Sequence, residues 1–94
     1  MSEKEKVRAH VYISGAVQGV FFRNNTKAKA DELGVFGFIN NLPDGRVEAL
    51  FEGEEDKAKE LVDWCRQGPE AAEVEDVNVT WEDYTGEFRE FLVH

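Results

Sequence analysis

The sequence contains only one cysteine, Cys65, among its 94 residues, which excludes an internal disulfide. It also has no Cys/His spacing typical of a metal site, so we expect neither a metal nor another cofactor. No apolar run approaches the roughly 20 residues that span a bilayer, and residues 1–6, MSEKEK, lack the apolar core of a secretion signal. These absences predict a cytoplasmic protein with no membrane partner.

Basic residues are scarce: lysine and arginine number 11 against 20 acidic residues, and the net charge is −9. Nucleic acids and anionic membranes require clustered lysine and arginine, so the charge argues against both as partners. The chain also lacks the G-x-x-x-x-G-K-[ST] and G-x-G-x-x-G motifs of nucleotide-binding proteins. However, residues 7–30 contain basic residues and no acidic one. This acid-free window favours an anionic ligand in that part of the chain.

The hydrophobic pattern predicts helices and strands in the order β-α-β-β-α-β. Alternating apolar residues predict strands over residues 7–14, 35–42, 46–52 and 77–82, with a short additional C-terminal strand within 88–93. Apolar stripes at helical spacing predict helices over 22–33 and from about 54 to 67. This order is that of the ferredoxin-like α+β sandwich, an antiparallel sheet with both helices on one face. We expect residues 7–94 to form a single, monomeric domain and residues 1–6 a disordered tail.

Residues 15–23, GAVQGVFFR, join the first predicted strand to the first predicted helix. Glycines let the backbone turn sharply and bring its amides close to a ligand. A helix N-terminus has unpaired N–H groups and a partial positive charge, which favour an anion. Arg23 adds a planar guanidinium suited to phosphate or carboxylate oxygens. A lone arginine is most often a surface residue paired with a carboxylate, but its place after this glycine loop predicts an oxyanion-binding site.

Few other residues suggest chemistry. Asn40 and Asn41 end the second predicted strand, and because neighbours on a strand point to opposite faces, at most one of them can face a site. Periodicity does not decide which. Cys65 lies on the apolar stripe of the second helix, where a buried structural residue is expected rather than a nucleophile. His10 and His94 are expected to be structural or surface residues.

Two blocks of the sequence resemble the acylphosphatase family. Residues 15–23 resemble its signature G-x-V-Q-G-V-x-F-R. Residues 30–48, ADELGVFGFINNLPDGRVE, resemble its second block, A-x-x-L-G-[LV]-x-G-[WF]-[VI]-x-N-x-x-D-G-x-V-E. The resemblance covers essentially the whole predicted domain. It implies a ferredoxin-like hydrolase that cleaves the carboxyl-phosphate bond of acyl phosphates, without a metal, to give a carboxylate and inorganic phosphate.

The resemblance also implies roles for individual residues. Matched by motif position, the phosphate-binding arginine is Arg23 and the water-positioning asparagine is Asn41, whereas Asn40 occupies a variable position. The phosphate is then held by the amides of the loop from Gly15 to Phe22 together with Arg23. The implied phosphate-binding residues are Ala16, Val17, Gln18, Gly19, Val20, Phe21, Phe22 and Arg23. The expected partners are a small acyl phosphate and inorganic phosphate.

Two other functions share this predicted topology. A non-catalytic anion-binding or regulatory module would bind phosphate at the same loop but would not hydrolyse an acyl phosphate. An RNA-binding sheet would require basic charge and exposed aromatic residues in an RNP motif, which this acidic sequence lacks. Hydrolysis of a generic substrate such as benzoyl phosphate distinguishes the enzyme from the binding module.

Overall fold

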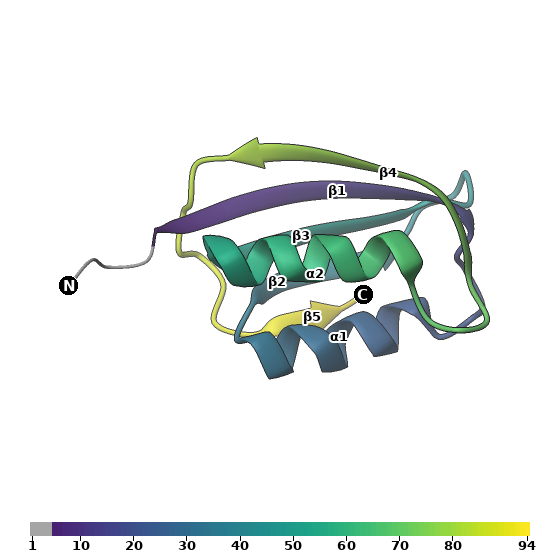
Figure 1. Cartoon of the computed structure of the whole chain (residues 1–94), viewed down its shortest axis with the longest axis horizontal. Coiled ribbons are helices and arrows are strands. Elements are labelled where there is room, and N and C mark those ends of the chain that lie inside the picture. Colours follow the sequence, from purple (N-terminus) through teal and green to yellow (C-terminus); the bar gives the residue numbers. More distant parts are fainter. Residues whose placement is uncertain (1–4) are drawn as a thin grey trace.

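A five-stranded sheet carries two helices side by side on one of its faces (Figure 1). The computed structural model describes residues 5–94. The elements in chain order are β1 (Lys6–Ala16), α1 (Phe22–Leu33), β2 (Phe36–Asn41), β3 (Val47–Glu54), α2 (Glu55–Gln67), β4 (Glu73–Glu82) and β5 (Phe91–Val93). The predicted ferredoxin-like α+β sandwich is confirmed. No helix in the described part of the chain is long and apolar enough to cross a membrane.

The strands are ordered β4-β1-β3-β2-β5 across the sheet. The first four pair in antiparallel fashion, as predicted. The short additional strand β5, whose direction the sequence did not predict, runs parallel to β2, so the sheet is mixed. The reason is the place where β4 ends. Because Glu82 and Phe36 lie at the same end of the sheet, the segment 83–90 crosses that end and brings β5 alongside β2 in the same direction (Figure 1).

The crossing segment is anchored by Glu52, a β3 residue that is only 2% exposed. Its carboxylate accepts hydrogen bonds from the main-chain N–H of Thr85 at 2.9 Å and of Gly86 at 3.2 Å. Arg8 of β1 pairs with the same carboxylate at 3.2 Å and with Glu87 at 2.7 Å. The free-energy cost of burying the Glu52 carboxylate is therefore offset by hydrogen-bond donors from both the sheet and the crossing segment.

β1 and β4 are the strands that extend furthest beyond their predicted ranges. β1 already begins at Lys6, which pairs with Glu54, while residues 1–4 of the predicted tail lie outside the described residues. β4 begins at Glu73, because residues beyond the bulge between Ser14 and Gly15 continue to pair with it. A Cβ at Gly15 would lie 2.2 Å from the Glu73 main-chain oxygen, so this close pairing requires glycine.

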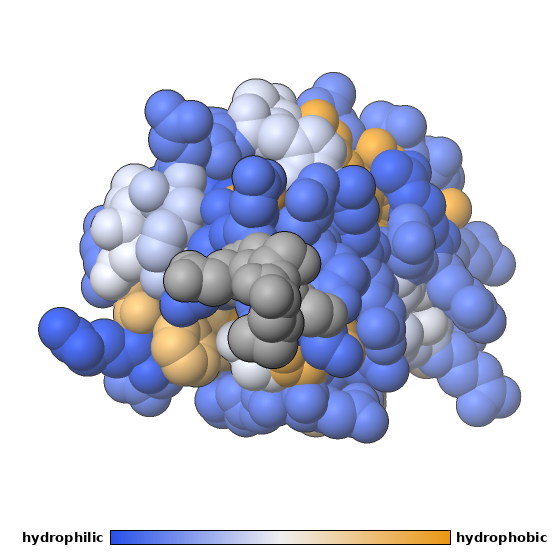
Figure 2. Space-filling model, turned by 60° about the vertical axis from the view of Figure 1, so that its left-hand side comes forward, coloured by the Kyte–Doolittle hydropathy of each residue, from blue (hydrophilic) through white to orange (hydrophobic). Residues whose placement is uncertain are grey.

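The core lies between the sheet and the helices. Ala9, Val11 and Ile13 alternate along β1 and are fully buried. The facing helices contribute Phe22, Thr26 and Ala30 from α1 and Ala58, Leu61, Val62 and Cys65 from α2. Burial raises the pKa of the Cys65 thiol to about 12, which agrees with the structural role expected for this residue. On the face shown in Figure 2, hydrophilic residues cover most of the visible surface, and apolar residues appear as separate patches among them.

Candidate active site

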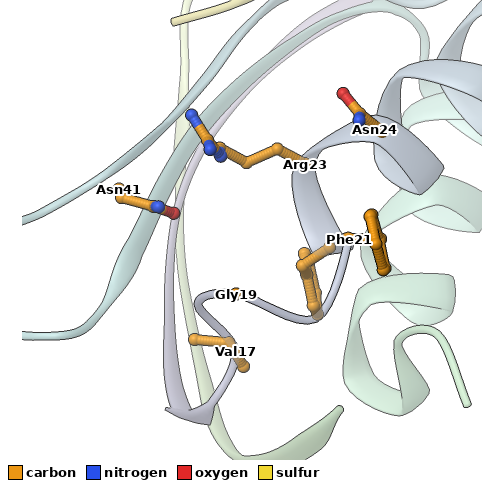
Figure 3. Close-up of a pocket in the computed structure, with 7 residues that line it drawn as sticks. Val17, Gly19, Phe21, Arg23, Asn24 and Asn41 are labelled. Atoms are coloured by element: carbon orange, nitrogen blue, oxygen red, sulfur yellow. The ribbon is translucent and has the colours of Figure 1, made fainter. Parts of the chain in front are cut away.

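The predicted anion loop and the end of β2 border one pocket of about 240 Å³ (Figure 3). Its lining residues are Val17, Gly19, Phe21, Phe22, Arg23, Asn24 and Asn41. The fold thus brings the Arg23 and Asn41 side chains together, as the family resemblance implied. Asn24 was not predicted, and no motif position pointed to it. The predicted residues Ala16, Gln18 and Val20 do not line this pocket.

The backbone of the loop is turned by two residues in the left-handed region. Gly19 has a φ of 75° and Phe21 a φ of 63°, and Phe21 is the one non-glycine residue between 5 and 94 with a positive φ. Phe21 is also the N-cap of α1, where it provides no side-chain hydrogen bond, and the first turn of the helix contains no acidic residue. The first N–H groups of α1 are therefore free of a side-chain cap, at a helix end that favours anions.

Arg23 extends from the first turn of α1 toward Asn41 (Figure 3). Its guanidinium donates a hydrogen bond to the main-chain oxygen of His94, and the His94 N–H donates to Ile39 of β2 at 2.9 Å. Within residues 5–94, Arg23 forms no ion pair with an acidic side chain. Arg23 is thus held in place by the segment after β5, and no acidic side chain among residues 5–94 neutralises its charge.

Asn41 is the last residue of β2. Its Oδ1 atom is buried and has no hydrogen-bond partner within the described part of the chain. Buried polar atoms in proteins nearly always have a partner, so this oxygen is suited to accept a hydrogen bond from water or substrate. The Oδ1 of Asn40 is also buried and unpaired, but Asn40 does not line the pocket. The structure therefore distinguishes the two asparagines, which strand periodicity alone could not: Asn41 lines the pocket and Asn40 does not.

Gln18 connects the anion loop to the β2–β3 turn. Its Nε2 donates hydrogen bonds to the main-chain oxygens of Leu42 at 2.8 Å and Arg46 at 2.9 Å. The turn itself is closed by a bond from the Leu42 N–H to the same Arg46 oxygen at 2.8 Å. The Gln18 side chain thus positions the loop against the residue that follows Asn41, a role that sequence reasoning missed because both acceptors are distant along the chain.

Removing this connection is expected to lower turnover without abolishing folding. Gln18→Leu keeps the approximate size of the side chain but removes both donated hydrogen bonds. The Leu42 and Arg46 oxygens each keep one main-chain donor, so we expect each lost hydrogen bond to cost about 0.5–1.5 kcal/mol. We expect a lower unfolding midpoint and a clearly reduced kcat, measured by thermal denaturation and by hydrolysis of benzoyl phosphate. A variant with wild-type kcat would contradict the positioning role of Gln18.

Comparison with known proteins places this chain in a protein family. A family model described as Acylphosphatase matches residues 9–93. An acylphosphatase of Pelotomaculum thermopropionicum is 54% identical over 88 residues, which cover 94% of this chain and 96% of that protein. The chain belongs to the acylphosphatase family. The predicted enzyme class, a hydrolase of acyl phosphates, is thereby confirmed.

Solved acylphosphatase structures share the whole fold. The chain resembles an acylphosphatase from Coxiella burnetii with a TM-score of 0.91 and 38% identity, over 100% of both chains. It resembles the Bacillus subtilis acylphosphatase with a TM-score of 0.90 and 31% identity, over 94% of this chain and 98% of that one. The similarity to acylphosphatases therefore includes every element that borders the pocket.

Proposed function

We propose that the pocket lined by Gly19, Arg23 and Asn41 hydrolyses acyl phosphates to a carboxylate and inorganic phosphate. The observation that carries this proposal is that Arg23, which pairs with no acidic side chain in residues 5–94, and the unpaired Asn41 oxygen line one pocket. The pocket also adjoins a helix N-terminus that has no side-chain cap. A phosphoryl group needs electrostatic stabilisation and an attacking water needs orientation. The pocket offers both.

The phosphoryl oxygens bind to the loop amides, the start of α1 and the Arg23 guanidinium. A guanidinium presents two parallel N–H donors, which match a pair of phosphate oxygens. The left-handed turns at Gly19 and Phe21 direct the loop backbone around this position. The phosphate is thus held by fixed donors that require no reorganisation during the reaction.

The water is oriented by Asn41. Its Oδ1 accepts a hydrogen bond from the water, whose oxygen attacks phosphorus in line with the bond to the acyl oxygen. The new O–P bond forms while the bridging P–O bond breaks, and the electron pair of that bond leaves with the carboxylate. The proton of the water passes to a phosphoryl oxygen, so the products are a carboxylate and dihydrogen phosphate. An amide has no basic nitrogen or carboxylate, so Asn41 orients the water and does not deprotonate it.

No histidine, cysteine, lysine or acidic residue lines the pocket in the described part of the chain. The mechanism we propose therefore uses positioning and electrostatic stabilisation, which suffice for a substrate whose leaving group is a stable carboxylate. Among residues 5–94, no group of three potential metal ligands gathers. Metal independence, the monomeric state and a cytoplasmic location remain predictions.

The proposal is tested by hydrolysis of benzoyl phosphate in the presence of excess EDTA. We expect stoichiometric release of benzoate and inorganic phosphate at a rate unchanged by the chelator. Phosphate binding without hydrolysis would favour the non-catalytic anion-binding module. Activity that disappears with EDTA and returns with added Mg²⁺ would contradict the metal-free mechanism.

A further inference from the structure

Phe21 is an exposed aromatic residue at the edge of the candidate active site. Its exposed fraction is 74%, the highest among the large hydrophobic residues of the described chain, whereas the next residue, Phe22, is buried in the core. A single exposed hydrophobic residue is common on protein surfaces and by itself indicates nothing. Phe21 differs from such residues in its position and in its backbone conformation.

The backbone of Phe21 is strained. A left-handed conformation is unusual for a bulky residue and costs about 1–3 kcal/mol, and such conformations gather at functional sites. A glycine would adopt the φ of 63° without this strain and would still place the loop amides around the phosphate. The Phe21 side chain therefore adds a conformational free-energy cost to a turn that glycine could form without it. This cost points to a role for the phenyl ring itself.

The geometry of the reaction indicates that role. The attacking and leaving oxygens lie on opposite sides of the phosphorus atom. Asn41 and Phe21 both line the pocket but come from different segments. In Figure 3 Asn41 lies on the left and Phe21 on the right, and Arg23 reaches from α1 toward Asn41. When water approaches from the side of Asn41, the acyl group leaves on the side of Phe21.

The charges of the pocket restrict the acyl group further. Arg23 is the one charged side chain that lines the pocket in the described part of the chain. In the proposed reaction its guanidinium already pairs with the phosphoryl group. A second phosphate or a carboxylate on the acyl group would have no cationic partner there. The apolar residues that line the pocket are Val17, Phe21 and Phe22, and of these only Phe21 is exposed, so its ring is the apolar surface available to an acyl group.

We propose that Phe21 contacts the acyl group of the substrate and gives this site a preference for apolar acyl phosphates, aromatic ones above all. The inference rests on the proposed hydrolysis at this pocket and adds the substrate class. Aromatic rings in contact prefer offset or edge-to-face arrangements, which an exposed ring with a free face can provide.

The test compares kcat/KM for benzoyl phosphate and acetyl phosphate. Phe21→Leu removes the ring, and Phe21→Asn removes it with a residue that tolerates the left-handed conformation and so preserves the turn. In both variants we expect kcat/KM for benzoyl phosphate to fall by about 3- to 10-fold, the range of an aromatic contact, while the value for acetyl phosphate stays within about 2-fold. The inhibition constant of inorganic phosphate should not change, because Phe21 is expected to contribute only its main-chain N–H to phosphate binding and both variants keep that group. Phe36→Leu is the matched control, since Phe36 is 41% exposed and lines a different pocket.

Each outcome bears on a different proposal. A fall for benzoyl phosphate alone supports the contact with Phe21. An equal fall for both substrates, or an unchanged ratio between them, overturns that contact but leaves the proposed hydrolysis standing, because the wild-type protein still cleaves both. A wild-type protein that cleaves neither substrate overturns the proposed function, and the preference with it.

Discussion

Replacing Arg23 by alanine is expected to abolish both phosphate binding and hydrolysis. Arg23 is the one charged side chain that lines the pocket within residues 5–94, and no acidic side chain pairs with it there. Arginines that stabilise a transferring phosphoryl group are worth about 10³-fold or more in rate. We therefore expect a loss of at least that size in kcat/KM for benzoyl phosphate, together with loss of inhibition by inorganic phosphate.

Two further variants make the Arg23 experiment specific. Arg23→Lys keeps the charge but loses the planar fork, so we expect it to restore little activity. Arg66→Ala removes an exposed arginine from the last turn of α2 and should leave activity unchanged. Near-normal phosphate inhibition in Arg23→Ala would falsify the anion-binding role of the pocket.

Replacing Asn41 by alanine is expected to separate catalysis from binding. The side chain contributes an unpaired buried oxygen to the pocket but no positive charge. Loss of a positioned hydrogen-bonding group in an active site typically lowers kcat by about 10²–10³-fold. We expect a loss of this order in Asn41→Ala, while the inhibition constant of inorganic phosphate remains close to that of the wild type.

Asn40→Ala is the matched control for this experiment. Asn40 precedes Asn41 on the same strand, and its side-chain oxygen is likewise buried and unpaired, but it does not line the pocket. We expect near-wild-type turnover for this variant. Equal losses in the two variants would indicate that both asparagines act through folding, and thermal denaturation of each variant measures that contribution. Unaltered turnover in Asn41→Ala would remove the water-orienting role.

Most elements of the fold were predictable because their signals are local. Alternation of Val11 and Ile13 with polar residues predicts a half-buried strand, and both apolar residues are indeed fully buried. Gly34 predicts the end of α1, and it adopts a left-handed φ of 72° at the C-cap. The glycine loop before Arg23 was recognisable in the same way because its residues are consecutive, and part of it lines the pocket; its phosphate-binding role remains a prediction.

The direction of β5 and the function of Gln18 were not predictable by the same means. β5 runs parallel to β2 because the segment 83–90 crosses the end of the sheet, where buried Glu52 holds it. Gln18 donates to carbonyl oxygens more than 20 residues away along the chain. Neither feature has a local sequence pattern, since both depend on which distant groups the fold brings within hydrogen-bonding distance.

The residues around the pocket show the same contrast between features that follow from local sequence and features that depend on long-range packing. Local order alone places Gly19, Phe21 and Arg23 on one turn, because they are neighbours at a strand-to-helix junction. Only the packed molecule places the Asn41 amide in the same pocket as Phe21 and leaves Asn40 outside that pocket. The reason is physical: short-range sterics and periodicity act within a segment, whereas a catalytic geometry is a set of distances between segments that only tertiary packing establishes.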